Sequence, residues 1–445
     1  MIWDRFRRTR DDVPAPAAPA DDVEAVEQDE EEPEALPEQS EETPWSERAL
    51  AVIPGGSSTG SKRVAAIYGD SPLDATLPTH YVRARGASLF LADGERELEV
   101  VDCTMALGSV AIGYADDHVV SSVVRAISLG HVGGMPSVLE VAVAERLGAF
   151  VSCAERVRFV KTGAEAVSAA VRIARTYTGR STVVHAGYLG WHDWAAGEDV
   201  AGVPREARAK SARIPFDDVA ALERAVSAAG SDLAAIVLEP VVEREPSREW
   251  LERARALADR AGAVLVFDEI KTGFRIRPGG YHEACGITPD LATYGKALAN
   301  GFPLAAVVGR SDVMDAATRT WISSTLAGET GGLAAANAVL DWHEREDVCA
   351  RLASIGAAMR AAVHRAVDAA GIPGIATFGL DQMWGIRFED AATEELFVRY
   401  AVEEGALFKR GAYNFAAIAH EDVIDDIESA ASGALVAIRE GGRKR

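Results

Sequence analysis

Apolar runs alternate with amphipathic stretches through the middle of the chain. The runs are rich in β-branched residues and contain no polar alternation, which is typical of strands buried on both faces. The predicted strands cover 156–160, 182–184, 233–238, 263–267 and 304–308. Helical periodicity lies between them, for example over 163–177 and 247–261. This repeated order of strand and helix predicts a doubly wound, mostly parallel sheet.

The two flanks of this region show other patterns. Residues 81–102 alternate apolar and polar positions around a turn at Gly94, which predicts a β-hairpin. Toward the carboxyl end the pattern predicts helices at 347–370, 392–404 and 421–439 and strands at 375–378 and 383–388. We therefore predict a large domain over 116–330 and a small α/β domain built from both chain ends, 44–115 and 331–445.

Composition and charge change this picture at the amino end. Residues 11–43 hold fourteen Asp and Glu and no Lys or Arg. Such a segment buries too little apolar surface to offset its ordering entropy, so we expect 1–43 to be a disordered acidic tail. A net charge of −22 argues against nucleic-acid binding. No apolar run reaches 18 residues, so no membrane helix is expected.

The four cysteines are scattered and show no metal-ligand spacing. Free thiols are typical of a reducing compartment, and we therefore expect a cytoplasmic protein without a metal site.

Candidate chemistry lies at the ends of two neighbouring runs. Asp268 ends the run 263–267, at the edge where open α/β sheets bind ligands. Lys296 follows Gly295 at the end of the next short run, in a chain with seven Lys against 39 Arg. An acid and an amine suit pyridoxal phosphate (PLP), because its aldehyde needs an amine for a Schiff base and its ring nitrogen needs an anion.

A third feature suits the phosphate of the same cofactor. Thr162, Gly163 and Ala164 follow a predicted strand and open a helix. Small residues at a helix start leave backbone N–H groups available to an anion. Many strand-to-helix turns have such residues, so the assignment of these three residues to the phosphate depends on the family resemblance described next.

Two segments carry a resemblance to a known family. Residues 268–275 (DEIKTGFR) and 294–303 (YGKALANGFP) resemble the class III aminotransferases of PLP fold type I, in the branch that contains glutamate-1-semialdehyde aminomutase. The resemblance implies a homodimer in which Thr325 reaches the phosphate of the neighbouring subunit.

Further cofactor residues follow from the resemblance. Tyr188 is expected to stack on the ring and Ile270 to pack on its opposite face, while Glu239, from a Glu-Pro-Val motif, organises hydrogen bonds near the ring. Leu189 stands where the family usually has a histidine, which places any hydrogen bond of that residue in doubt.

Two more positions depart from the family pattern. Lys161 stands where an asparagine or serine is common in the family. Its side chain can add positive charge beside the phosphate loop. Glu329-Thr330 replaces the commoner Asn-Pro, which weakens the case for aminomutase activity.

Substrate groups are expected on two loops. Ser57, Lys62 and Arg63 follow a glycine turn that lies over the active site in the family, and Arg410 borders the expected pocket. An arginine suits a carboxylate, whereas lysine is a point charge, and an exposed basic turn is an equal alternative.

The resulting hypothesis is an aminotransferase that moves an amino group between an amino donor and a small carbonyl compound or sugar-like substrate. An aminomutase that moves the amine within one substrate is the nearest alternative. A PLP-binding scaffold without turnover is the third.

Overall fold

The computed structural model describes residues 43–71, 77–93, 96–197 and 200–441. The predicted acidic tail lies outside these residues, apart from its last position. Among the described helices, none is long and apolar enough to cross a membrane.

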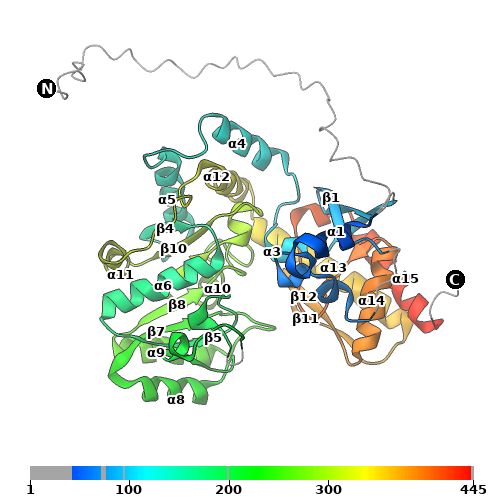
Figure 1. Ribbon diagram of the computed structural model, residues 1–445. Coiled ribbons are helices and arrows are strands. Elements are labelled where there is room, and N and C mark those ends of the chain that lie inside the picture. The colour runs from blue at the N-terminus through cyan, green and yellow to red at the C-terminus, as the bar shows by residue number, and fades with distance from the viewer. Residues whose placement is uncertain (1–42, 72–76, 94–95, 198–199, 442–445) are drawn as a thin grey trace, which may run out of the picture. The chain divides into compact units, whose positions relative to one another are not determined.

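A seven-stranded sheet forms the centre of the large part of the molecule (Figure 1). Its order is β4 (Arg156–Val160), β10 (Ala305–Gly309), β9 (Leu291–Tyr294), β8 (Val264–Asp268), β7 (Leu233–Leu238), β5 (Thr182–Ala186) and β6 (Ser211–Arg213). Every neighbouring pair is parallel except those of β10, which is antiparallel to both β4 and β9. The mostly parallel, doubly wound sheet is therefore confirmed, and β7 and β8 are buried along their whole length.

Helices cover both faces of this sheet, because successive strand residues point to opposite sides. On β8, Val266 packs in the cluster with α6 (Gly163–Thr178), whereas Phe267 packs with α8 (Val219–Ala229) and α9 (Arg248–Ala261). The remaining helices of this region are α4 (Asp117–Ser128), α5 (Val138–Phe150), α7 (Arg205–Arg208), α10 (Tyr281–Cys285), α11 (Ser311–Met314) and α12 (Thr330–Arg345). Helix α8 was not predicted from the sequence.

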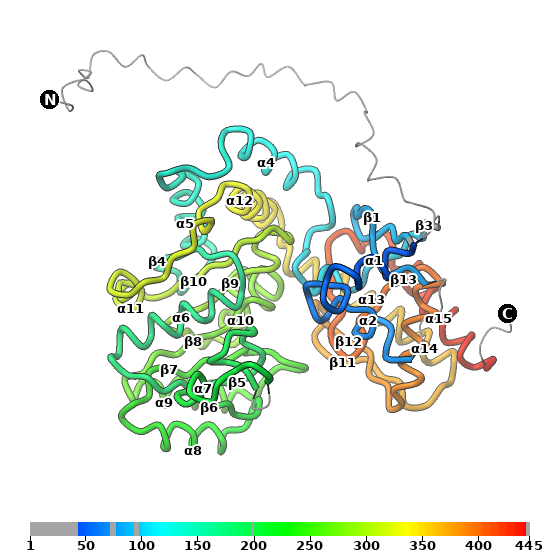
Figure 2. The backbone as a smooth tube through the Cα atoms, viewed as in Figure 1, coloured from blue at the N-terminus to red at the C-terminus, as the bar shows by residue number. Residues whose placement is uncertain are grey.

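Strands from both chain ends share one of two smaller sheets. Its order is β1 (His80–Arg85), β2 (Ser88–Asp93), β3 (Arg96–Asp102) and β13 (Ala406–Leu407). Strand β13 runs parallel to β3, which brings the orange carboxyl-terminal part beside the blue amino-terminal part (Figure 2). The predicted hairpin is confirmed as part of a three-stranded antiparallel meander, of the kind that the family resemblance implies, in which the chain also turns at Gly86, where φ is +58°.

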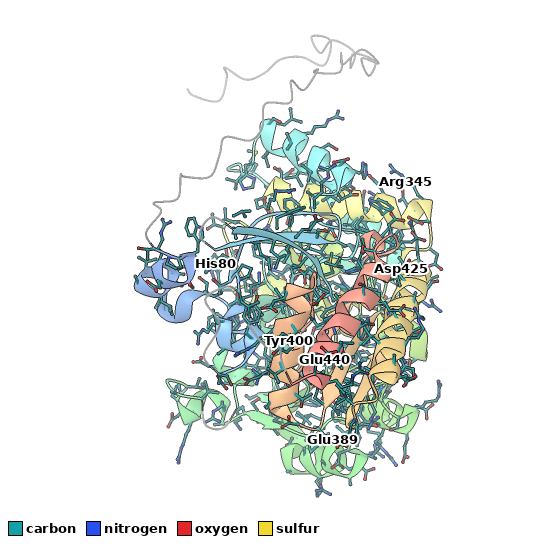
Figure 3. The ribbon with its side chains drawn as sticks, turned by 90° about the vertical axis from the view of Figure 1, so that its right-hand side faces the viewer. His80, Arg345, Glu389, Tyr400, Asp425 and Glu440 are labelled. Carbon is teal, nitrogen blue, oxygen red and sulfur yellow. The ribbon has the colours of Figure 1, made fainter. Side chains whose placement is uncertain are left out.

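The other small sheet has the order β11 (Ile375–Leu380), β12 (Met383–Phe388) and β14 (Asn414–Phe415). The helices around both small sheets are α1 (Trp45–Val52), α2 (Val64–Tyr68), α3 (Met105–Gly108), α13 (Val348–Ala370), α14 (Ala391–Glu403) and α15 (Ile424–Arg439). Helices α14 and α15 lie side by side, with Tyr400 on α14 and Asp425 and Glu440 toward opposite ends of α15 (Figure 3). One core cluster joins Ala306 of the large sheet to Val339, Leu352 and Leu435 of the carboxyl-terminal helices.

Candidate active site

Asp268 lies at the carboxyl end of β8 and is buried. Its Oδ1 accepts hydrogen bonds from Thr293 Oγ1 at 3.1 Å and from Ile270 N at 3.1 Å. Burial, together with the nearby Glu239 charge, raises the pKa of Asp268 to about 7. The side chain is therefore an acid whose ionised form gains from a cationic partner.

The adjacent Glu269 has a different task, because successive residues of a strand end diverge. It is fully buried and accepts hydrogen bonds from the backbone N–H groups of Tyr281 at 2.8 Å and His282 at 2.9 Å, and from Thr272 Oγ1. Glu269 thus anchors the loop that leaves β8. Its place in the motif at 268–275 gives no local signal for this role.

Lys296 follows β9 and begins the short helix η7 (Lys296–Ala299). Its φ is +49°, a left-handed conformation that is costly for a residue with a Cβ and that is found most often at functional sites. Burial and the Lys271 cation, acting against the charges of Glu239 and Asp268, lower the pKa of Lys296 to about 8. The amine is therefore close to neutral at slightly alkaline pH.

Ile270 connects the phosphate loop to the lysine. A Cβ added to Gly163 would lie 3.2 Å from Ile270 Cδ1, and one added to Gly295 would lie 3.1 Å from the same atom. Because neither glycine has a side chain, the start of α6, the residue after β9 and Ile270 after β8 can lie in contact. The structure thus brings the predicted acid, amine and phosphate residues into one site.

The phosphate loop is held by a capping box at the start of α6. Thr162 Oγ1 accepts from Glu165 N at 3.3 Å, and Glu165 Oε2 accepts from Thr162 N at 2.9 Å. The first-turn N–H groups at Gly163 and Ala164 have no intrahelical acceptor and are therefore available to an anion.

The loop after β5 lies directly against this helix start. Gly190 has a φ of +91°, and a Cβ there would lie 2.6 Å from Ala164 Cβ. Tyr188, two residues earlier, is 71% exposed, which leaves its ring available for stacking. Leu189 points the other way into the apolar core, so its side chain takes the place of a histidine without any polar contact there.

Glu239 is held by two partners beside Lys296. Its Oε2 accepts from Tyr188 N at 2.8 Å, and its Oε1 forms an ion pair with Lys271 Nζ at 2.6 Å. Lys271 also lies 4.4 Å from the Tyr413 ring centroid. Sequence reasoning missed Lys271 as a member of the site, although it stands inside the motif at 268–275.

Arg275 was also missed. It is fully buried and donates to the carbonyl oxygens of Ala416 at 2.7 Å and Gly108 at 3.0 Å. The second carbonyl belongs to a turn in which Met105, Ala106 and Leu107 all have positive φ. A buried guanidinium thus supports a strained backbone segment, and it also helps to lower the pKa of Lys296.

The predicted substrate residues fall into two environments. Ser57, Lys62 and Arg63 line a cavity of about 960 Å³ that Leu107 also borders. Arg410 instead donates to Ala65 O at 3.0 Å and lies 3.6 Å from both Glu394 and Glu395, so binding a substrate anion would require these contacts to break.

Thr325 lies in a second cavity of about 650 Å³, together with Leu129 and Met135. None of the other predicted cofactor residues lines this cavity. Within one protomer, Thr325 is therefore not grouped with them.

The residues present fit PLP on their own chemistry. A buried acid can face the ring nitrogen, a buried amine of lowered pKa can meet the aldehyde, and a helix start can hold the phosphate.

Comparisons with known proteins point to one family. The model of the family described as aminotransferase class III matches residues 71–428. The chain is 30% identical over 427 residues to glutamate-1-semialdehyde 2,1-aminomutase of Akkermansia muciniphila, covering 89% of this chain and 98% of the relative. It is 30% identical over 335 residues to 3-aminobutyryl-CoA aminotransferase of Cloacimonas acidaminovorans, covering 74% and 78%. The FumI protein of Sphingopyxis sp. MTA144, solved in its PLP internal aldimine form, has a TM-score of 0.82 at 28% identity and covers 89% of this chain and 96% of its own.

Proposed function

Because the chain belongs to the class III aminotransferases, which are PLP-dependent enzymes of fold type I, we propose that Lys296 and Asp268 are its catalytic residues. The enzyme then transfers an amino group between an amino donor and a small carbonyl compound or sugar-like substrate. The observation that carries this proposal is that Ile270 lies against both Gly163 and Gly295, the residue before Lys296, while the charges of Asp268 and Glu239 act on the Lys296 amine.

Each cofactor residue has a contact that suits its role. Thr162, Gly163 and Ala164 hold the phosphate at the start of α6, and Tyr188 with Ile270 encloses the ring. When bound, PLP supplies an aldehyde that carries the amine and a ring that accepts electrons.

Asp268 acts on the ring nitrogen. Burial and the nearby Glu239 charge raise the pKa of Asp268 to about 7, because together they outweigh the hydrogen bonds and the Lys296 charge that favour the carboxylate. A protonated ring nitrogen provides a cationic partner, and the pair keeps both charges. Thr293 Oγ1 holds the carboxylate in place.

Lys296 is the amine that forms the Schiff base and later moves a proton at its Nζ. A base works best when its pKa lies near the working pH, and burial with the Lys271 charge brings Lys296 to about 8. The Lys271–Glu239 ion pair therefore tunes the base as well as holding the Tyr188 loop.

Substrate recognition is assigned to the loop with Ser57, Lys62 and Arg63. These residues share a cavity whose other walls are mostly apolar, so the loop is suited to hold an anionic end of a partly apolar substrate. Arg410 joins them only if its contacts with Glu394 and Glu395 are released.

A cytoplasmic homodimer completes the proposal, with Thr325 reaching the neighbour's phosphate. Leu129 and Met135, which line the Thr325 cavity, are each 85% exposed. Large apolar side chains gathered at one exposed place favour a protein interface.

Reduction with borohydride tests the proposal directly. Purified protein should show a PLP absorbance band, and borohydride should attach the cofactor to the peptide that contains Lys296. Lys296→Ala should bind PLP without this attachment and should lose transfer of amino groups. Attachment to another lysine would overturn the assignment.

An aminomutase is the second candidate, because aminomutases are among the relatives that match. Incubation with the amino donor alone separates the two candidates. A transaminase loses its PLP absorbance band when only the donor is present, and a second carbonyl compound restores the band. An aminomutase turns over one substrate with no acceptor. A stable PLP band with no turnover of any donor would indicate a scaffold.

A further inference from the structure

Two separate departures from the family pattern meet in space. Lys161 Nζ lies 2.5 Å from Glu329 Oε1, although 168 residues separate the two positions. Both side chains are nearly buried, with 13% and 7% of their surfaces exposed. A buried pair of charges is costly to form. Removing one of the two charges destabilises the protein, because the other charge then stays buried without its partner.

Each partner is anchored to a different element. Lys161 Nζ also donates to Pro303 O at 3.0 Å. Glu329 caps α12 by accepting from Gly331 N at 2.7 Å and Gly332 N at 2.9 Å, and its Oε2 lies 3.3 Å from His131 Nδ1. Burial alone would raise the pKa of Glu329, but the hydrogen bond from Lys161 and those from the helix hold it below its usual value.

The pair acts next to the phosphate loop. Lys161 directly precedes Thr162, and Glu165 Oε2 accepts from the backbone N–H groups of both residues, at 3.0 and 2.9 Å. The Lys161 side chain therefore ties this short, hydrogen-bonded loop to the start of α12. Its ammonium is directed to Glu329 and Pro303.

We propose that Lys161 and Glu329 are positioning residues whose buried ion pair latches the phosphate loop against α12 and keeps it in the geometry that binds the cofactor phosphate. The inference rests on the proposed function, because it needs the phosphate to lie at residues 162–164. It replaces the hypothesis that Lys161 adds its charge directly to the phosphate.

The two roles of Lys161 make opposite predictions for Glu329→Gln. The glutamine keeps an oxygen to cap α12 but loses the charge that holds Lys161. If the pair is a latch, the phosphate loop loosens in this variant and PLP binds more weakly. If Lys161 instead acts on the phosphate, the change frees its ammonium, and PLP binds as tightly as before or more tightly.

The experiment measures the PLP dissociation constant of the apo protein for four chains: wild type, Lys161→Met, Glu329→Gln and the double variant. We expect each single change to raise the constant, by about tenfold or more for Lys161→Met, which leaves a buried carboxylate unpaired. The double variant should bind PLP more tightly than Lys161→Met, because neither charge is then left alone. Lys210→Met, which removes a lysine from the exposed pair with Asp232, should change nothing.

Hydrogen exchange in the apo protein tests the latch without the cofactor. Amides 162–166 should exchange faster in both single variants than in wild type. Unchanged exchange, or tighter PLP binding in Glu329→Gln, would overturn the latch. Faster exchange in the variants of a protein that takes up no PLP would instead overturn the proposed function and leave the latch standing.

Discussion

At the scale of single residues, charges of both signs surround one amine. Lys296 shares its site with Lys271, Glu239 and Asp268, and the balance of these charges with burial decides when the amine is neutral. Because Lys271 Nζ and Glu239 Oε1 lie 2.6 Å apart, removing either charge also changes how the other one acts on the pKa of Lys296.

Lys271→Met tests this balance. The change removes a cation near Lys296 and leaves the Glu239 carboxylate unpaired, and both effects favour the protonated amine. The pKa of Lys296 should therefore rise from about 8 by roughly one unit or more. The measurement is the pH dependence of PLP capture by apo protein, whose midpoint should move upward. A midpoint that stays in place or falls, with Lys210→Met as the reference, would contradict the assignment.

Asp268→Asn keeps the shape of the acid and removes its charge. The ring nitrogen then loses its anion, and the rate of amino transfer should fall by about three orders of magnitude or more, as when a preorganised charge is removed. Single-turnover kinetics with excess amino donor measure this loss. PLP should still bind, because the phosphate loop is unchanged. A variant with near-normal rates would show that another group faces the nitrogen.

At the scale of elements, the site depends on close approaches between loops that end separate strands. The loop after β5 meets the start of α6 at Gly190, and the loop after β9 meets the phosphate loop through Ile270. At Gly190 an added Cβ would occupy the space of the Ala164 backbone, whereas at Gly163 and Gly295 it would press on the Ile270 side chain.

Gly190→Ala tests the first of these approaches. The new methyl group would lie 2.8 Å from the Cα of Ala164, so the phosphate loop must shift. We expect PLP affinity to fall by about tenfold or more, since small misplacements of a site are costly. Gly202→Ala is the matched control, because Gly202 also has a positive φ, +83°, but nothing lies within 4 Å of an added Cβ.

Gly202→Ala should cost only about 1–2 kcal/mol of backbone strain and leave PLP affinity unchanged. Thermal unfolding and PLP titration of both variants separate strain from contact. Equal loss of affinity in the two variants would contradict the role given to the Gly190 contact.

At the scale of the whole molecule, Thr325 lies in a cavity that none of the other proposed cofactor residues of its protomer lines. Exposed apolar residues line the same cavity. A second copy that covers them would bury apolar surface, which supplies the driving force for association.

Met135→Asp should weaken the dimer, because it places a charge in the apolar contact. Sedimentation velocity should show more monomer, and PLP affinity should fall with it. Leu396→Asp, an exposed apolar position on α14, should leave the assembly unchanged. Thr325→Ala should keep the dimer and weaken PLP binding. A Met135→Asp protein that remains dimeric with normal PLP affinity would contradict the proposed interface.

The sequence by itself determined most strands of the large sheet, although not β6, and the identity of the chemical groups. Buried strands such as 233–238 carry a continuous apolar run, and the start of α6 carries its cap, so both have a local signal. The segments 268–275 and 294–303 likewise hold the acid and the amine within short stretches.

Only the tertiary structure decided which distant charges meet. Segments far apart in the chain are joined by the ion pairs Lys161–Glu329 and Lys271–Glu239. They are also joined by the hydrogen bonds from Arg275 to the carbonyl oxygens of Gly108 and Ala416. Local periodicity reports which face of an element is buried, but it carries no information on which residue of another element lies opposite. These contacts form because the folding of the sheet brings the ends of its strands to one edge, where buried charges must find partners.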